Sequence, residues 1–287
     1  MSGPLVSVVL PVRDGARYLP AALDSLRGQT LADIELICID DASSDATAAI
    51  LLEAARADAR IKVVTNARRR GLPASLNLGF ANASGSFHSW ASHDNLAHPT
   101  MLERLHAALD RSPDSAIAYS DYEEIDANGA PVGRQAARPP SHLLLANVVG
   151  PAFLYRAEVW SALGGYDEAL EGVEDYDFWL RARHRFGFAR VDEDLLRYRL
   201  HLASMTTTRA AEIADLHDRL LEREIRREGE ARAEAIAWLG LMRMREDAKR
   251  LRYLPKAFRR DPSLTLRSSL ANWRWLQASL AAAGCRS

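Results

Sequence analysis

A regular alternation of short apolar runs and helix-forming segments over the first 120 residues constrains the fold of this chain most. Helix-forming segments lie at 16–28, 45–58, 73–83 and 101–109. This alternation predicts a mostly parallel β-sheet with helices on both faces. We expect the first strand to end at Pro11. The apolar runs are VSVVL (6–10), IELICI (34–39), IKVV (61–64), SFHSW (86–90) and AIAYS (116–120).

Polar residues directly follow three of the predicted strands. PVRD follows the first strand, DDASSD follows the second and SHDN follows the fourth. The carboxyl ends of parallel strands meet at one edge of an α/β sheet, and ligands bind at that edge. A shared binding site therefore explains three acid-containing loops at one edge better than three unrelated turns would.

Regular structure continues after residue 120. DANGAPVG (126–133) predicts a hairpin turn. VEDYDFWLRARHR (173–185) predicts a helix with an acidic first turn and a basic last turn, which suits the helix dipole. In this interpretation Asp177 is an exposed helix acid, and Gly164 and Gly165 give backbone freedom to a turn.

The end of the chain is charged and helix-prone over 209–255, and a last helix is expected over 264–282. From Arg243 onward, eleven Lys and Arg residues face only three acids. Two interpretations stay open. The helices pack against the rest of the chain or a second subunit, or they rest on an anionic membrane surface. The second interpretation uses Arg259, Arg260, Arg267, Arg274, Trp273 and Trp275.

Charge and cysteine content narrow the possible functions. A net charge of -1 argues against nucleic acid as a partner of the whole protein. Cys38 lies in an apolar run, and with Cys285 it makes no metal-ligand spacing, as is typical of a reducing compartment. No apolar run approaches the ~18 residues that cross a bilayer, and no signal peptide is recognised. We therefore expect a cytoplasmic protein, at the inner face of the membrane if the basic helices bind there.

Five segments occur in an order that resembles the family 2 glycosyltransferases: SVVLPVRDGARYLPAALDSLRGQT, ICIDDASSDAT, WASHDNLAHPTMLE, GGYDEAL and EDYDFWLR. The likeness covers roughly the first 205 residues. It implies an α/β fold with a GT-A-type, Rossmann-like, mostly parallel sheet, flanking helices and a C-terminal helical extension. Residues 1–208 would form the catalytic domain, with a nucleotide-binding half over about 1–120 and an acceptor half over about 121–208, and 209–287 the extension.

The resemblance also implies an activity and its partners. The activity is inverting transfer of a hexosyl or N-acetylhexosaminyl group from a nucleotide sugar, most often a UDP-sugar, to an acceptor hydroxyl. Mn²⁺ or Mg²⁺ would assist. The implied acceptor is a glycan or a lipid-linked sugar in the synthesis of polysaccharide or cell-envelope glycoconjugate, and a homo-oligomer is compatible with it. The donor sugar and the linkage are not readable from the sequence.

The resemblance assigns roles residue by residue. Asp175 is the implied catalytic base, with Glu174 as the alternative. Asp94 is the implied metal ligand, and His201 would complete the metal shell. The implied nucleotide-binding residues are Pro11, Val12, Arg13, Asp40, Asp41, Arg70, Gly71, Ser92 and His93.

The chain departs from the family pattern at three positions. Arg13 stands where an aromatic residue is common, and Asp14 stands where Asn is usual. Ser92 replaces the first acid of the metal motif, which removes one charged ligand and weakens the expected hold on the ion. Ser92 also keeps open a rival function, a catalytically degenerate relative that only binds a nucleotide sugar or a glycan. A dinucleotide dehydrogenase is disfavoured because no G-x-G-x-x-G follows a strand.

Structural roles compete with each assigned role. Asp94 could cap the helix that begins near Pro99, and Asp40 and Asp41 could be turn residues. Glu174 and Asp175 could be first-turn acids that only suit the helix dipole. His201 could be a hydrogen-bonded histidine. Ser43 and Asp45 are expected to be structural.

Overall fold

The computed structural model describes residues 3–144, 146–228 and 254–260 of the 287-residue chain. Within these residues, nine strands form one sheet in the order β3-β2-β1-β4-β8-β6-β9-β5, and β7 pairs with β6. The strands are β1 (Val6–Val12), β2 (Ile34–Asp40), β3 (Ile61–Thr65), β4 (Phe87–Trp90), β5 (Leu96–Ala97), β6 (Ser115–Ile125), β7 (Pro131–Gln135), β8 (Phe153–Arg156) and β9 (Gly187–Arg199).

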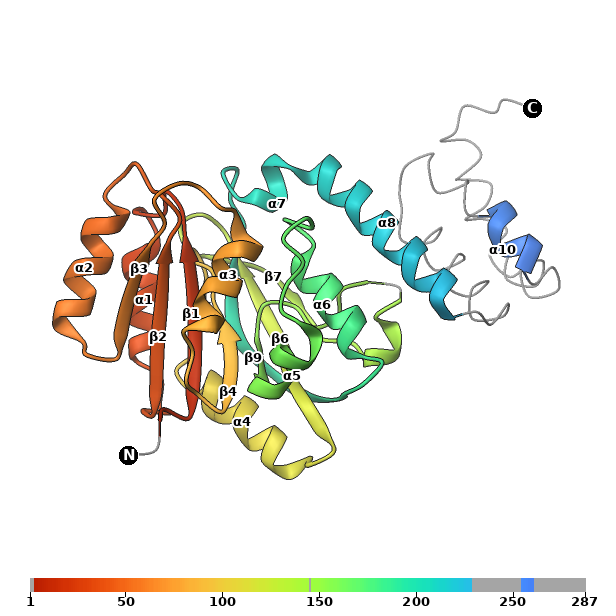
Figure 1. Ribbon diagram of the computed structural model, residues 1–287, viewed down its shortest axis with the longest axis horizontal. Coiled ribbons are helices and arrows are strands. Elements are labelled where there is room, and N and C mark those ends of the chain that lie inside the picture. Colours follow the sequence, from red (N-terminus) through yellow and green to blue (C-terminus); the bar gives the residue numbers. More distant parts are fainter. Residues whose placement is uncertain (1–2, 145, 229–253, 261–287) are drawn as a thin grey trace. The chain divides into compact units, whose positions relative to one another are not determined.

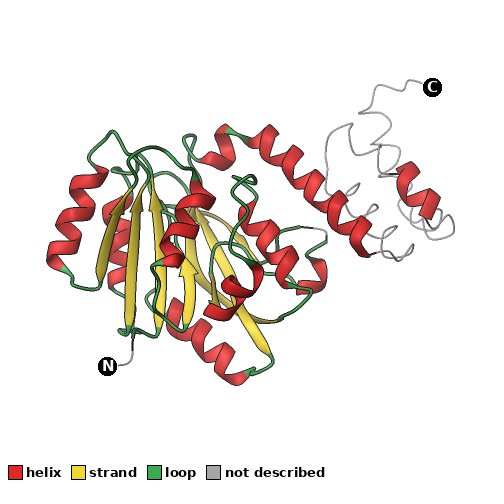
Figure 2. Cartoon of the chain, viewed as in Figure 1, coloured by secondary structure: helices red, strands yellow, loops and turns green. Residues whose placement is uncertain are grey.

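The helices follow the alternation that the sequence predicts over its first part (Figures 1 and 2). The expected helix over 264–282 lies outside the described residues. The helices are α1 (Leu19–Arg27), α2 (Thr47–Ala57), α3 (Leu72–Ala81), α4 (Met101–Arg111), α5 (Ala157–Leu163), α6 (Glu174–Ala182), α7 (Met205–Thr208), α8 (Ala210–Glu228) and α10 (Leu254–Arg260), with a short 3₁₀ helix at Pro140–His142.

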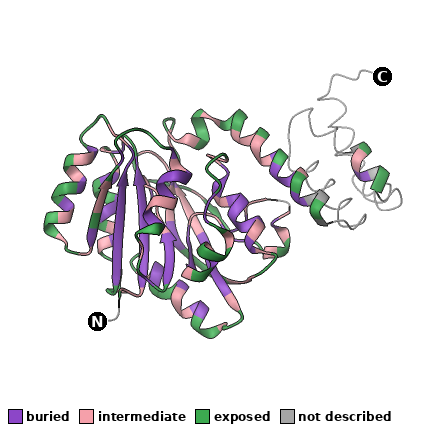
Figure 3. Ribbon diagram, in the orientation of Figure 1, coloured by how far each residue is buried: buried purple, intermediate pink, exposed green. Residues whose placement is uncertain are grey.

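The four strands β1 to β4 pair in parallel. Every residue of β1 and β2 is buried, which explains their nearly continuous apolar sequence, and Figure 3 shows these strands in purple. The prediction that the first strand ends at Pro11 was wrong, because β1 continues to Val12. Pro11 is tolerated since the pairing of β1 with β4 ends at Val9, so the missing N–H of Pro11 removes no bond from that side.

The second half of the sheet is mixed. β8 pairs antiparallel with both β4 and β6, and β9 runs parallel to β6. β6 and β7 form the predicted hairpin, whose turn is closed by Asp126 N–H donating to the Ala130 carbonyl at 2.8 Å. The predicted α/β class with flanking helices is confirmed. The antiparallel strands are the part of the sheet that the alternation did not announce.

The chain forms two compact units, one of residues 1–140 and 148–213 and one of residues 141–147 and 214–287. The first unit holds the whole sheet. In the second unit, Leu220, Leu221 and Ala257 are buried, and Lys256 pairs with Glu222 at 2.7 Å. In the described part of the chain, no helix has both the length and the apolar character that crossing a membrane requires. Of the residues predicted to meet a membrane, Arg259 and Arg260 are described, and both are exposed.

One face of the sheet packs its apolar core against α1 and α4. Leu19, Leu23 and Leu26 of α1 share this core with Leu102 and Leu105 of α4. On the other face, α3 approaches β1 closely, because a Cβ added at Gly79 would lie 2.3 Å from the Val9 side chain. The Cys38 thiol is fully buried, as expected, and burial raises its pKa to about 12. The helices on the two faces of the sheet hold the strands in place, and the strand ends set the positions from which the loops at the carboxyl edge begin.

Candidate functional site

The loops that follow β1 and β2 are hydrogen-bonded to each other. The Asp14 carboxylate accepts the Ser44 N–H at 2.7 Å and the Ser44 hydroxyl at 3.0 Å, and these bonds lower its pKa. The Asp45 carboxylate accepts the Ala16 N–H at 3.0 Å. Asp14 has a positive φ of 47°, a conformation that Asp tolerates better than most residues. The structural role expected for Asp45 is confirmed.

Two of the predicted nucleotide-binding residues lie at the base of these loops. Asp40 is buried and accepts the Ser43 N–H at 3.0 Å, as a turn residue does. Arg13 is exposed and pairs with Asp14 at 3.5 Å. The guanidinium of Arg13 is therefore open to an anion. Pro11 and Val12, predicted beside them, are buried in β1.

Asp41 holds the loop that precedes α3. Its carboxylate accepts three bonds, from the backbone N–H of Arg70 at 2.7 Å, the N–H of Gly71 at 2.9 Å and the Asn66 side-chain amide at 2.8 Å. The side chain is buried. Asp41 thus brings Arg70 and Gly71 to the same edge as the loop after β1, and binding of a nucleotide by these residues stays a prediction.

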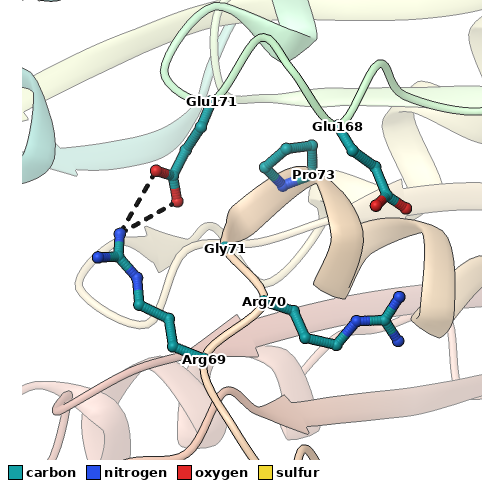
Figure 4. A pocket seen from close by; sticks show the side chains of 6 residues that line it. All are labelled: Arg69, Arg70, Gly71, Pro73, Glu168 and Glu171. Carbon is teal, nitrogen blue, oxygen red and sulfur yellow. Dashed lines mark hydrogen bonds and ion pairs between the residues drawn. The ribbon is translucent and has the colours of Figure 1, made fainter.

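A cavity of about 220 Å³ opens beside this loop (Figure 4). The Arg70 side chain is exposed and makes no hydrogen bond or ion pair with another described residue. An arginine without a partner at the wall of a cavity is suited to bind an anionic group. The cavity is lined by Arg69, Arg70, Gly71, Pro73, Glu168 and Glu171.

Asp94 pairs with His201 across the sheet edge. The His201 Nε2 lies 3.0 Å from one carboxylate oxygen of Asp94, and the Ser92 hydroxyl donates to the other at 2.5 Å. Arg199 donates its Nε–H to the Asp94 carbonyl at 2.9 Å. The alternative that Asp94 caps the next helix is wrong, because the cap residue of α4 is Thr100.

His93 packs against the loop that follows β1. A Cβ added at Gly15 would lie 2.5 Å from the His93 ring, so glycine is needed there for the ring to approach. Burial lowers the pKa of His93, which keeps its ring neutral at pH 7. His93 therefore helps join the loops after β1 and β4.

Tyr18 belongs to the same site and was missed in the sequence. Its ring lies 5.1 Å from the His201 ring and 4.7 Å from the Arg199 guanidinium, measured to the ring centroid. The arginine contact is a cation–π interaction. Tyr18 stands in GARY and Arg199 in YRLH, so their only signal was adjacency to predicted site segments.

Glu174 and Asp175 open α6, as predicted. Glu174 is buried and accepts the Gly172 N–H at 2.5 Å. Burial, and then the neighbouring charge of Asp175, raise the pKa of Glu174 to about 8. Asp175 is only partly buried. Two adjacent acids thus differ in surroundings, and Glu174 is the one held protonated at neutral pH.

The expectation that Asp177 is an exposed helix acid was wrong. Asp177 is 1% exposed and pairs with Arg181 at 2.7 Å. Arg181 also donates to the carbonyls of Leu163 and Gly165, both at 2.8 Å. The pair is buried because Arg181 reaches back over the preceding turn, where Gly165 has the positive φ expected for it.

Asp94 and Asp175 both act on one tyrosine. Burial raises the pKa of Tyr198, and the charges of Asp94 and Asp175 add to the increase. Tyr122, whose ring lies 5.8 Å from that of Tyr198, also has its pKa raised, to about 12, by burial and by charges that include Asp175. Both predicted acids therefore lie within electrostatic range of the Tyr198 hydroxyl.

Metal-ligating side chains form a pair here and not a larger group. Among the described residues, no cluster of three or more His, Cys, Asp and Glu side chains could hold a metal ion. Asp94 and His201 are the two predicted ligands that lie together. Ser92, where the family pattern has an acid, adds a hydroxyl beside them.

The chain thus has an α/β sheet with polar loops gathered at the carboxyl edge of its parallel strands, an arrangement that known proteins share. A family model described as "Glycosyl transferase family 2" matches residues 7–158. An uncharacterized glycosyltransferase of Rickettsia prowazekii is 29% identical over 235 residues, with 75% of this chain and 70% of the relative covered. One of Rickettsia typhi is 31% identical over 225 residues, with 71% and 67% covered.

Solved structures share the fold. S. aureus TarS 1–349 in complex with UDP-GlcNAc is similar with a TM-score of 0.68 and 17% identity, over 91% of this chain and 82% of that chain. The mannosyltransferase PcManGT from Pyrobaculum calidifontis, in complex with GDP-Man and Mn²⁺, is similar with a TM-score of 0.64 and 17% identity, over 98% and 86%. The GT-A fold predicted from the sequence is confirmed. The chain belongs to glycosyltransferase family 2 and is a glycosyltransferase.

Proposed function

We propose that this glycosyltransferase moves a sugar from a nucleotide sugar, preferably a UDP-sugar, to an acceptor hydroxyl with inversion at the sugar carbon. One observation carries the proposal: Asp94 and His201, the two predicted metal ligands, lie together with 3.0 Å between carboxylate oxygen and ring nitrogen, and Asp175 opens α6 as a partly buried acid. Similar structures in complex with UDP-GlcNAc and with GDP-Man support a nucleotide-sugar donor.

Asp175 is the proposed base. A carboxylate that takes the proton of the acceptor hydroxyl during attack makes the oxygen a better nucleophile. Attack from the side opposite the leaving diphosphate inverts the sugar carbon. Glu174 is a poor alternative, because it is buried and accepts the Gly172 N–H. Its pKa is raised to about 8, so it already carries a proton at neutral pH. Because Glu174 is protonated at neutral pH, it places no second negative charge beside Asp175.

Asp94 and His201 are the proposed holders of Mn²⁺ or Mg²⁺. One carboxylate oxygen and one imidazole nitrogen 3.0 Å apart fit a single divalent ion whose other ligands are phosphate oxygens and water. Imidazole favours Mn²⁺ over Mg²⁺. When bound, the ion would neutralise charge on the diphosphate. Arg13 and Arg70 are exposed cations at the same edge, suited to the nucleotide phosphates or base.

The acceptor is proposed to be a glycan or lipid-linked sugar in polysaccharide or cell-envelope synthesis. A relative named O-antigen biosynthesis protein RfbC, from Myxococcus xanthus, supports this class at 32% identity over 183 residues, although this chain covers only 14% of it. Residues 1–208 are proposed as the catalytic domain. The cytoplasmic location and a membrane contact through the basic C-terminal helices are proposals of the same kind.

The decisive experiment compares the wild-type protein with Asp175→Asn and the control Asp110→Asn, an exposed aspartate on α4. A panel of UDP- and GDP-sugars with Mn²⁺ is first screened by the rise in melting temperature, since a bound donor stabilises the folded state. With the selected donor, Asp175→Asn should lower kcat by about 10³-fold, as loss of a general base does. The control should retain full activity.

A degenerate relative that only binds a nucleotide sugar or a glycan is the rival function, and Ser92 is the observation that favours it. The rival predicts a melting-temperature rise without any transfer or donor hydrolysis in the wild-type protein. No rise with any donor would contradict the transferase and a nucleotide-sugar-binding relative, and would leave only a glycan-binding one.

A further inference from the structure

We propose that Glu171 is a positioning residue that ties the segment carrying Asp175 to the segment carrying His201 and to the start of α3. The inference rests on the proposed function for its catalytic consequence. Its contacts lie within one compact unit of the chain. Three segments far apart in the sequence meet at this one carboxylate, and each leads directly to a proposed site residue.

The first tie joins Glu171 to the start of α3. One carboxylate oxygen accepts the Leu72 N–H at 3.1 Å, and Arg69 lies 3.4 Å from both oxygens (Figure 4). A free N–H at a helix start favours a negative partner. The approach is close, because a Cβ added at Gly71 would lie 2.9 Å from the same oxygen. Glu171 thus meets the loop that Asp41 holds from the other side.

The second tie joins Glu171 to the segment after β9. The other carboxylate oxygen pairs with Arg209 at 2.7 Å. Arg209 follows α7, whose cap residue Ser204 donates its N–H to the His201 carbonyl at 3.2 Å. The Thr207 hydroxyl donates to the same carbonyl at 3.2 Å. A shift of Arg209 is therefore carried to His201 through a short hydrogen-bonded segment.

The third link is covalent and short. Glu171 stands three residues before Glu174 and four before Asp175. Gly172, between them, has a φ of 100° and donates to Glu174 at 2.5 Å. A Cβ at Gly172 would lie 2.9 Å from the Ile213 side chain, so this turn is packed as well as bonded. We expect the turn to move little while the Glu171 carboxylate keeps its contacts with Leu72 and Arg209.

Charge supports the role. Burial alone would raise the pKa of Glu171, but the Leu72 N–H and Arg209 outweigh it and lower the pKa, so the carboxylate is ionised at neutral pH. Its side chain is only 23% exposed. Gln at this position would keep an acceptor for Leu72 and lose the charge that holds Arg209.

The test uses the full chain with Glu171→Gln, Arg209→Gln and the double variant. The control is Glu158→Gln, since Glu158 is an exposed glutamate of α5 outside the 164–174 loop and is not among the described contacts of Glu171 or Arg209. Three quantities are measured: kcat for transfer, donor affinity by calorimetry, and amide hydrogen exchange of the 164–174 and 199–209 peptides. Misplacement of a base by about 1 Å can cost up to 10²-fold in rate.

We expect Glu171→Gln to lower kcat by about 10-fold and to weaken donor affinity by a smaller factor, because the segments of Asp175 and His201 shift while the Asp41 loop stays. Exchange should rise in both peptides. The double variant should be no worse than Glu171→Gln alone. A further variant, Arg209→Lys, keeps the positive charge and should retain more of kcat than Arg209→Gln. The Glu158→Gln control should match the wild-type protein in all three measurements.

Several results would overturn the inference: exchange that rises in only one peptide or in neither, an unchanged kcat, or an equal effect in the control. A general loss of folding would raise exchange throughout the sheet as well and is distinguished by that. If the wild-type protein transfers no sugar, the proposed function fails, and the exchange data alone decide whether Glu171 ties the two segments.

Discussion

Two buried glutamates near opposite edges of the sheet have nearly the same exposure, but their pKa values are shifted in opposite directions. Glu35, at the start of β2, is 4% exposed, and Glu174, at the start of α6, is 3% exposed. Burial would raise the pKa of Glu35, but its hydrogen-bond partners outweigh it and lower the pKa to about 2. Burial and Asp175 raise the pKa of Glu174 to about 8.

The difference comes from the partners. Glu35 accepts bonds from the Ser7 hydroxyl at 2.6 Å, the Lys62 ammonium at 2.6 Å and both the N–H and hydroxyl of Ser84, at 2.7 and 2.8 Å. Glu174 accepts the Gly172 N–H and faces a second acid. At the amino edge, hydrogen-bond donors compensate the buried charge of Glu35. Among the described residues, Glu174 at the carboxyl edge lacks such a set of donors, and it is protonated at neutral pH. Perturbed acids of the second kind gather at functional sites.

The largest expected effect breaks the amino-edge network. Glu35→Leu should lower the free energy of unfolding by about 3 kcal/mol, because it strands the Lys62, Ser7 and Ser84 donors without their acceptor. The affinity for the nucleotide sugar and the kcat for transfer should not change. Denaturant unfolding measures the loss, and Glu53→Leu, an exposed residue of α2, is the control. An equal loss in both variants would refute the view that the network matters.

A smaller effect is expected from the loop that carries Glu174. Asn77 on α3 donates its amide to the Tyr166 carbonyl at 2.9 Å and accepts the Tyr166 N–H at 2.8 Å, so one side chain pairs with the backbone in both directions. Asn77→Ala should cost about 2 kcal/mol of unfolding free energy, since two bonds are lost in a partly buried place. Asn82→Ala, at the exposed end of the same helix, should cost less than half as much.

An effect about as large as that of Asn77→Ala depends on pH. Between the unfolded pKa of 4.5 and the folded value of about 8, folded Glu174 keeps a proton that the unfolded chain releases. Stability from this group is therefore complete below pH 4.5 and is lost as pH rises toward 8. Glu174→Gln removes this dependence, so the free energy of unfolding of the variant should rise relative to wild type by about 2 kcal/mol between about pH 5 and pH 7.

Glu35 gives the opposite sign and serves as the internal comparison. Its contribution is present above pH 4.5 and is lost as pH falls toward 2. Unfolding curves at a series of pH values should separate the two glutamates. A Glu174→Gln variant that loses stability relative to wild type as pH rises would show that the acid is ionised in the folded state.

The sequence predicted the parts of the fold that depend on local pattern. The first four strands and their helices follow from apolar runs and helix-forming segments, and family 2 membership follows from ordered motifs. The extension of β1 past Pro11 was not predictable, because it depends on where the pairing with β4 ends. The antiparallel β8 likewise depends on pairing between strands distant in sequence.

The site was predictable where a motif marks it and not where a contact makes it. Asp94 and His201 were both named from motifs, and they lie 3.0 Å apart across more than a hundred residues of sequence. Asp177 was misassigned because helix periodicity does not reveal that Arg181 folds back onto the Gly165 turn. Glu171 carried no signal, since its three partners come from other segments.

Gly165 sets a limit on how this enzyme can be re-engineered. Its φ is 80°, and any side chain would begin 2.6 Å from the Asn77 amide oxygen. A library that randomises residues 160–170 to change acceptor preference would lose nearly every clone altered at this position through misfolding, whatever the acceptor. Position 165 should therefore be held constant, and diversity placed at neighbours such as Asp167 and Glu168, which are exposed.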